Sequence, residues 1–211
     1  MKNSKKHTKN LELVQLSLLA AVMVVLQLFV TMLVRVGAVA PTLALIPLVI
    51  ASAALGIKGG AILGALFGFI AFICGLTGLD AFTNMMIMYK PAETLLVCLS
   101  KAILAGIFSA IVYKLIMAAT KKKLFPSVLA ASIIAPVTNT ALYVLGMALF
   151  FREMVPGHSF TDTDGLGVII AAVFMIIITN FILEVIVTAI CTPIVATILT
   201  KSKDYKKLLL K

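Results

Sequence analysis

The sequence predicts an all-α integral membrane protein, a bundle of six transmembrane helices with both termini in the cytoplasm. Three observations predict this fold class. The 211 residues are 62% hydrophobic and 12% charged, with a mean hydropathy of +1.17, which excludes a soluble or disordered chain. Apolar stretches long enough to cross about 30 Å of hydrocarbon recur along the chain. Basic residues flank these stretches, as in cytoplasmic loops, and form no exposed face for nucleic acid.

The six spans are expected to form one membrane domain over residues 1–211. Apolar runs place them between a basic tail at 1–10 and another at 200–211, at about 11–34, 41–55, 59–76, 93–118, 125–151 and 166–199. The first run lacks a small-x-small cleavage site, so it is interpreted as a span and not as a signal peptide. The sixth would extend about 50 Å as one straight helix. We therefore expect it to tilt, to continue past the bilayer or to bend at Pro193.

The distribution of basic residues tests the number of spans. With both termini inside, fourteen of the 18 lysines and arginines fall on the cytoplasmic side, and the outer half keeps only Arg35, Lys90, Lys101 and Arg152. Cytoplasmic loops carry such an excess of positive charge. A bundle of five or seven spans would instead place one lysine-rich terminus outside.

The stretch 37–72 is nearly free of charge and carries glycines at steps of four, namely Gly56, Gly60, Gly64 and Gly68. Residues four apart lie nearly one above another on a helix, so these glycines predict a groove that the backbone of a neighbouring helix can approach closely. Pro41 and Pro47 interrupt the first half of the stretch, and a turn at 56–60 divides it. The pattern predicts a tight helical hairpin whose second helix is surrounded by neighbours.

Several polar residues fall at membrane depth, where they are costly and usually face a cavity or one another. Lys101, Asn139, Asn180 and Glu184 lie in a broad central zone of their spans, and Asn180 and Glu184 share a helical face through their spacing of four. One interpretation is structural: Lys101 pairs with Glu184, and the two asparagines bond across helices. The other is a central pocket with a few polar groups among apolar walls, as in small-molecule sites.

Two outer loops, 77–92 and 152–165, carry five of the eight acidic residues if Glu93 at the start of the next span is included. They are predicted either to cover a binding site or to be plain solvated connections. Arg35 follows the first span, where it would close the pocket and attract an anion or extend to the headgroups. The substrate-binding residues predicted in all are Arg35, Asn84, Lys101, Asn139, Tyr143, Asn180 and Glu184.

Catalytic and metal chemistry is not expected. The histidines, His7 and His158, lie outside the spans, and the three cysteines stand singly in apolar segments, so neither a metal site nor a disulfide is indicated. The chain also lacks a G-x-x-x-x-G-K-[ST] motif for ATP hydrolysis and a G-x-S-x-G nucleophile motif. The sequence therefore predicts a transport or binding protein and not an enzyme.

Four features are spread over nearly the whole chain: the lysine-rich start, the segment from Ile46 to Ala61, the polar Thr138-Asn139-Thr140, and the segment from Thr179 to Val187. Together they resemble the substrate-binding S component of an energy-coupling factor vitamin transporter. The resemblance implies six helices in the bacterial cell membrane and a small vitamin bound near the outer face. It also implies a transmembrane coupling protein and two cytoplasmic ATPases as partners. These ATPases would use ATP and Mg²⁺, whereas this chain would bind no cofactor and no nucleic acid.

The family contacts its coupling protein through small residues spaced Ala-x-x-x-Ala on the first helix. The matching positions here are Ser17 and Ala21, with Ala20 beside them, so serine replaces the first alanine. Because serine is still small, the resemblance implies that close approach is preserved. The alternative is that Ser17 and Ala21 pack only within the bundle.

Within the family, the patterns around Ile46-Pro47 and Thr138-Asn139-Thr140 are most like the pantothenate-specific subgroup. Pantothenate carries one carboxylate, an amide and two hydroxyls, which suit a lysine or arginine for the carboxylate and Asn139, Asn180 and Tyr143 for the rest. The absence of Trp leaves little broad stacking surface for a flavin or pterin.

Other functions remain open at this point. The chain could be an S component for riboflavin, pyridoxine, hydroxymethylpyrimidine or niacin. It could instead be a self-sufficient carrier that uses Glu184 for proton coupling with Lys101 as its partner. A third possibility is a structural membrane protein without a ligand.

Overall fold

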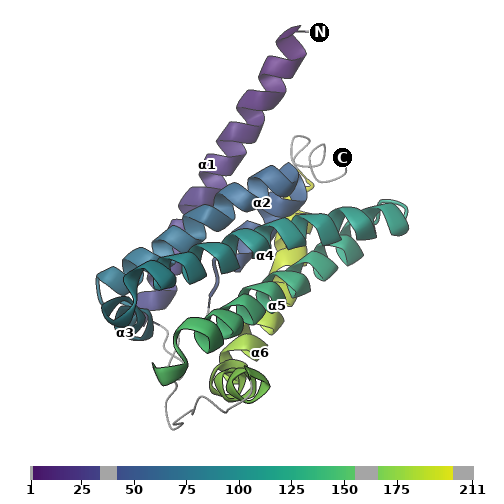
Figure 1. The fold of residues 1–211 in the computed structure, drawn as a ribbon. Coiled ribbons are helices and arrows are strands. Elements are labelled where there is room, and N and C mark those ends of the chain that lie inside the picture. Colours follow the sequence, from purple (N-terminus) through teal and green to yellow (C-terminus); the bar gives the residue numbers. More distant parts are fainter. Residues whose placement is uncertain (1, 34–41, 155–165, 202–211) are drawn as a thin grey trace.

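The computed structural model describes residues 2–33, 42–154 and 166–201, and this part of the chain is helical with short turns. Its elements in chain order are α1 (Lys2–Leu33), α2 (Leu45–Leu76), α3 (Ala81–Tyr89), α4 (Pro91–Ala119), α5 (Leu124–Phe150), the short 3-10 helix η1 (Arg152–Met154) and α6 (Leu166–Leu199). Within it, five stretches are long and apolar enough to cross a membrane: Asn10–Met32, Leu45–Leu76, Pro91–Ala119, Leu124–Phe150 and Ile177–Leu199. The fold is an all-helical bundle of membrane type (Figure 1).

The stretch α2 is divided at Gly56, where the backbone is non-helical at φ 69° and ψ −158°. A Cβ built on Gly60 would lie 2.5 Å from Ser52 Oγ, although eight residues of continuous helix would separate these positions by about 12 Å. The two halves of α2 therefore fold back on each other, at the turn placed at 56–60 from the sequence. Gly56 thus lies in the turn and not on the helical ladder of glycines to which the sequence analysis assigned it. A count of six membrane crossings, with both termini cytoplasmic, stays a prediction.

The second half of α2 packs closely against α4 along the remaining glycines. A Cβ built on Gly60, Gly64 or Gly68 would lie 2.5 Å from the backbone carbonyl oxygen of Gly106, Ala102 or Cys98, respectively. Real Cβ atoms do not come this close to a carbonyl oxygen, so glycine is required wherever the two backbones meet at this distance. Ser52 Oγ adds a hydrogen bond of 2.9 Å to the Gly106 carbonyl. This contact holds α4, and with it Lys101, against the hairpin.

Two segments that the sequence analysis left outside the spans are helical. α1 begins at Lys2, so most of the predicted basic tail at 1–10 continues the first helix. α3 occupies the middle of the predicted loop 77–92, where Asp80 Oδ1 accepts hydrogen bonds from the backbone N–H groups of Phe82 and Thr83 at 3.2 and 3.3 Å. An aspartate at an N-cap satisfies free N–H groups at the start of a helix. A nine-residue helix with one such cap is a weak signal in sequence.

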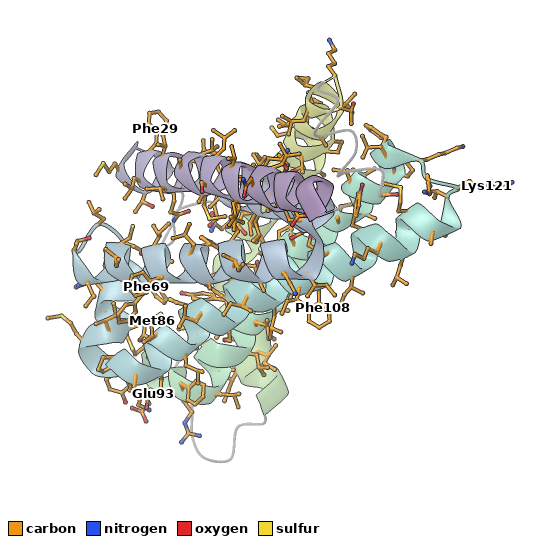
Figure 2. All side chains as sticks on the ribbon, turned by 90° about the horizontal axis from the view of Figure 1, so that it is seen from above. Phe29, Phe69, Met86, Glu93, Phe108 and Lys121 are labelled. Atoms are coloured by element: carbon orange, nitrogen blue, oxygen red, sulfur yellow. The ribbon has the colours of Figure 1, made fainter. Side chains whose placement is uncertain are left out.

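The ends of the bundle differ in character. Figure 1 places the start of α1, the turn between α4 and α5 and the end of α6 toward one end, and α3 and the end of α5 toward the other. The turn between α4 and α5 contains Lys121 to Lys123. Gly56 belongs to the same end, because a Cβ built on it would lie 3.3 Å from Lys114 Nζ near the end of α4. Phe29, Phe69 and Phe108 point away from the bundle (Figure 2) and are 57%, 53% and 45% exposed. Large apolar side chains on an outer surface are expected where lipid is the solvent. Lysines at one end fit the predicted cytoplasmic side.

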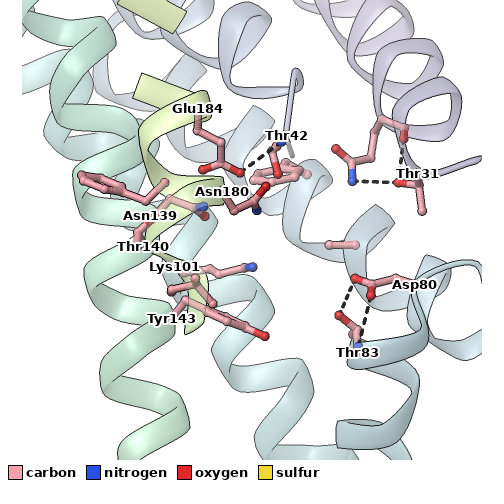
Figure 3. Close-up of a pocket in the computed structure, with 15 residues that line it drawn as sticks. Thr31, Thr42, Asp80, Thr83, Lys101, Asn139, Thr140, Tyr143, Asn180 and Glu184 are labelled. Atoms are coloured by element: carbon pink, nitrogen blue, oxygen red, sulfur yellow. Dashed lines mark hydrogen bonds between the residues drawn. The ribbon is translucent and has the colours of Figure 1, made fainter. Parts of the chain in front are cut away.

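The sixth helix is continuous from Leu166 to Leu199. Figure 1 draws its first turns nearly end-on and its later turns from the side, so the helix changes direction along its length. The tilt, the extension past the bilayer and the bend at Pro193 that the sequence allowed stay predictions. The later part of α6 brings Asn180 and Glu184 toward the centre of the bundle (Figure 3).

Candidate functional site

A cavity of about 630 Å³, counted together with its mouth, lies where the helices converge. Every helix from α1 to α6 contributes to the walls, which are formed by Gln27, Thr31, Thr42, Phe67, Ala71, Asp80, Thr83, Lys101, Asn139, Thr140, Tyr143, Ile177, Asn180, Phe181 and Glu184. Figure 3 shows these side chains pointing toward a common space. Besides Tyr143, ten of these fifteen side chains are polar or charged, so the cavity is more polar than the few polar groups among apolar walls that the sequence predicted. It suits a hydrophilic ligand.

Five of the seven residues predicted from the sequence line this cavity: Lys101, Asn139, Tyr143, Asn180 and Glu184. Asn84 does not, because its side-chain amide donates a hydrogen bond of 2.8 Å to the Gly75 carbonyl and so joins α3 to α2. Arg35 lies outside the residues that the structure describes, as does His158 of the second outer loop. That any of these residues binds substrate remains a prediction.

Lys101 provides the positive charge of the cavity wall. Its ammonium nitrogen lies 4.5 Å from the centre of the Tyr143 ring, a distance at which the face of the ring attracts a cation. Within the part of the chain that the structure describes, Lys101 and Glu184 form no ion pair, and Glu184 accepts a hydrogen bond of 3.1 Å from the backbone N–H of Thr42. The direct Lys101–Glu184 pair considered as a structural alternative is thus not formed. The ammonium can therefore interact with an anion in the cavity.

Glu184 connects α6 to the start of α2. Its side chain is 5% exposed, and its partner, the backbone N–H of Thr42, lies three residues before α2. Thr188, one turn further along α6, donates to the carbonyls of Glu184 and of Ser132 on α5 at 2.6 and 3.0 Å. These bonds hold Glu184 at a fixed place in the cavity wall.

Asp80 contributes the second carboxylate of the wall. It caps α3 and also accepts a hydrogen bond of 2.7 Å from Thr83 Oγ1. The backbone of α3 and Thr83 therefore partly neutralise its charge. Asp80 is in this way mainly a structural group at the edge of the cavity.

The wall includes two amide oxygens, Asn139 Oδ1 and Gln27 Oε1, that are buried without a hydrogen-bond partner among the described residues. Asn139 is 5% exposed and Gln27 8% exposed, and the amide nitrogen of Gln27 donates to Thr31 Oγ1 at 3.3 Å. Leaving a buried acceptor unsatisfied costs about 1–3 kcal/mol. Both oxygens are thus suited to a hydrogen-bond donor supplied by a ligand.

The sequence analysis missed several wall residues because nothing in a single span indicates which polar groups meet. Gln27 and Thr31 are four residues apart in the first span. This spacing predicts that they share one face of the helix, but it does not indicate that this face borders the cavity. Thr140 directly follows Asn139, yet the sequence does not tell that both side chains reach the cavity. Asp80 was assigned to a loop. Only the packing of α1 and α3 against the bundle brings these groups to the site.

At the end of the bundle near α3, two contacts tie outer segments together. Tyr89 Oη donates a hydrogen bond to a Glu153 carboxylate oxygen, and Lys90 Nζ donates one of 3.0 Å to the Phe150 carbonyl. Phe82 of α3 also packs against the cluster that contains Phe151. Through these contacts α3 is fixed to the end of α5 and to η1, beside the mouth of the cavity.

The small residues of α1 assigned to partner contact differ in their surroundings. Ser17 and Ala21 are exposed, with Ser17 Oγ donating to the Leu13 carbonyl at 3.0 Å, whereas Ala20 packs against the core. Leu18 and Val22 on the same side are 55% and 42% exposed. The alternative in which Ser17 and Ala21 pack inside the bundle therefore does not hold. Their role in partner contact remains a prediction.

Comparison with known proteins agrees with this arrangement. Residues 11–196 match the family described as the substrate-specific component of ECF transporters. The chain is also 29% identical over 212 residues to the pantothenic acid transporter PanT of Lactococcus lactis subsp. cremoris (strain MG1363), with 94% of this chain and 98% of that protein covered. Members of this family are transport subunits and not enzymes. The chain belongs to the family of substrate-specific components of ECF transporters, as its sequence features indicate.

Proposed function

We propose that this protein captures pantothenate at the outer face of the bacterial cell membrane and delivers it inward together with an ATPase-driven coupling module. The observation that carries the proposal is the ammonium of Lys101, placed over Tyr143 in the cavity wall and in no ion pair with the residues that the structure describes. A cation in the wall of a cavity favours a ligand with a carboxylate. The similarity to a protein named as a pantothenic acid transporter supports the same ligand.

The other wall groups suit the remainder of pantothenate and orient it. Asn139 Oδ1 and Gln27 Oε1 need donors, which the hydroxyls and the amide N–H of the ligand supply. Glu184 and Asp80 repel the carboxylate end and accept hydrogen bonds from hydroxyls. The ligand is thus expected to place its carboxylate at Lys101 and its hydroxyl end toward Glu184.

The chain needs partners for the energy of transport. It carries no phosphate-binding motif for ATP, so hydrolysis is assigned to two cytoplasmic ATPases that act through a transmembrane coupling protein. The exposed Ser17 and Ala21 of α1 are the positions expected to meet that protein. Release of the vitamin inside would follow from movement of the whole bundle within the membrane.

Ligand binding is tested by thermal unfolding of the purified protein in detergent with pantothenate, riboflavin, folate, thiamin, pyridoxine, hydroxymethylpyrimidine, niacin and biotin. Pantothenate is expected to raise the unfolding temperature, because a ligand that binds only the folded state stabilises it. Lys101→Met and Asn139→Ala should reduce this shift. Lys58→Met, which removes an exposed lysine at the opposite end, is the matched control and should keep the full shift.

A rise in unfolding temperature with a different vitamin would replace pantothenate as the proposed ligand, while the proposed binding function would stand. No shift with any vitamin would contradict the proposal. Uptake into vesicles that contain the coupling module should stop when ATP is withheld while a proton gradient is kept. Uptake that continues under these conditions would instead indicate a self-sufficient proton-coupled carrier.

A further inference from the structure

A second cavity lies at the lysine-rich end of the bundle and shares no residue with the first. It is bounded by the start of α1, the Gly56 turn of α2 and the last turns of α4. Its volume, counted with the mouth, is about 1070 Å³, larger than that of the central cavity. The proposed transport function uses none of its residues.

The charge in this cavity is positive. Lys114 and Lys122 contribute two ammonium groups to its wall, and Glu12 contributes one carboxylate. Lys114 lies against the hairpin turn, since a Cβ built on Gly56 would be 3.3 Å from its Nζ. Lys122 belongs to the α4–α5 turn, where its N–H bonds to the Met117 carbonyl at 3.0 Å. Both lysines are exposed, so their ammonium groups are accessible to an incoming anion.

The inner wall of the same cavity is apolar. Ala53, Ala54 and Met117 are 6%, 7% and 7% exposed and face it together with Ala118. The small side chains of the two α2 alanines leave room beside Met117 and Tyr113. A positively charged rim above an apolar wall matches an anion that carries a hydrocarbon chain, and a small hydrophilic anion would leave the wall unused.

We propose that this cavity binds an anionic phospholipid, with the phosphate between Lys114 and Lys122 and the upper part of an acyl chain against Ala53, Ala54 and Met117. Lysines near the inner leaflet attract its anionic lipids. The cavity lies at the end where the basic residues of this chain gather. An acidic segment of a partner protein would use the same charge but would need no apolar pocket of this depth.

The test is the retention of lipid by the purified protein in detergent, measured by native mass spectrometry with added phosphatidylglycerol or phosphatidylcholine. Phosphatidylglycerol should be retained more strongly. The double variant Lys114→Ala/Lys122→Ala should weaken this retention, by about fivefold for each lysine removed. The matched control Lys58→Ala/Lys201→Ala removes two exposed lysines from the same end outside the cavity, and it should retain the lipid as the unmodified protein does.

Two further variants test the site without removing a lysine. Glu12→Gln removes the carboxylate that the described residues place in the wall, so retention of phosphatidylglycerol should rise. Ala118→Phe fills the cavity from an exposed position on α4 without changing the charge, so retention should fall. Millimolar inorganic phosphate should not displace the lipid, because the apolar wall contributes to binding.

If the Lys58/Lys201 control lost phosphatidylglycerol as much as the Lys114/Lys122 variant, the lipid would be attracted by all the lysines at this end of the bundle. That result would overturn the proposed site. Equal retention of the two lipids, or full displacement by phosphate, would also overturn it. A double variant that keeps its lipid but no longer co-purifies with the coupling protein would assign the cavity to a protein partner instead. The vitamin-dependent thermal shift should be unchanged in every one of these variants. A failure of the lipid-site proposal can therefore be told apart from a failure of the vitamin-binding proposal.

Discussion

The ammonium nitrogen of Lys101 on α4 lies 4.5 Å from the centre of the Tyr143 ring on α5. Tyr143 itself is 7% exposed, and its hydroxyl points toward Met86 Sδ at 3.7 Å. The ring therefore holds the cation through its face, while its hydroxyl is used elsewhere. This geometry leaves the ammonium available to a bound anion.

Replacing the aromatic ring of Tyr143 should lower the affinity for pantothenate, whereas removing only its hydroxyl should not. Tyr143→Phe keeps the aromatic face and is expected to bind pantothenate nearly as the unmodified protein does. Tyr143→Leu loses a cation–π interaction of about 0.5–2 kcal/mol, so the affinity should fall by about 2- to 30-fold. Isothermal titration calorimetry measures both. Equal losses in the two variants would show that the hydroxyl, and not the ring, matters.

Lys101 should distinguish ligands by charge. Its ammonium is expected to pair with the carboxylate of pantothenate, and a charge-assisted hydrogen bond of this kind contributes about 1.5–3 kcal/mol. Lys101→Met should therefore lower the affinity for pantothenate by at least about tenfold. It should hardly change the affinity for pantothenol, in which a hydroxymethyl group replaces the carboxylate. The ratio of the two dissociation constants is the measurement. A ratio that Lys101→Met leaves unchanged would remove the lysine from carboxylate recognition.

The close contact of α2 with α4 should not tolerate larger residues. Leucine at Gly64 would place its Cβ 2.5 Å from the Ala102 carbonyl oxygen, so the helices must separate and the bundle should lose about 1–3 kcal/mol or more. Because α4 carries Lys101, vitamin uptake should fall as well. Thermal unfolding in detergent measures the stability, and Ala65→Leu, at a half-buried neighbouring position, is the control. Unchanged folding and uptake in Gly64→Leu would contradict the packing role.

The hairpin turn should depend on glycine at one position. Gly56 has φ 69° and ψ −158°, a region that is essentially restricted to glycine, so Gly56→Ala should lower stability by about 1–3 kcal/mol. Gly167→Ala is the matched control, because a Cβ there meets nothing within 4 Å and alanine favours a helix. The unfolding temperature should fall only in the first variant. A similar result for both would show that the turn accepts other residues.

The bond between Tyr89 and Glu153 should appear in an alkaline titration. The Glu153 carboxylate beside it raises the pKa of Tyr89 above its ordinary value near 10, mainly through the hydrogen bond that the phenol donates. The neutral phenol is thus the favoured form: the link is intact below pH 10 and is lost as the pH rises through the raised pKa. Tyrosinate absorbance near 295 nm, compared with that of Tyr89→Phe, isolates this residue. In Glu153→Ala the pKa of Tyr89 should fall back toward 10, and no change would contradict the bond.

The all-helical membrane class follows from the sequence alone, because each membrane-spanning helix is a long apolar run bounded by charged residues. It also placed the turn near Gly56 and five residues of the cavity wall, since a polar group at membrane depth stands out against apolar neighbours. Family membership followed from features spread over the whole chain. None of these inferences required knowing which helices touch.

Which polar groups meet depends on how the helices pack together. Lys101 and Glu184 are of opposite charge and similar depth, so the sequence allowed a pair, yet the helix positions set by the Gly64 contact and by the Thr42–Glu184 hydrogen bond place Lys101 over Tyr143 instead. The same holds for Gln27, which reaches the wall through the packing of α1, and for the second cavity at Lys114. Helical periodicity fixes the face on which a side chain lies. The partner of that face depends on the rotation and contact of whole helices, which no single span encodes.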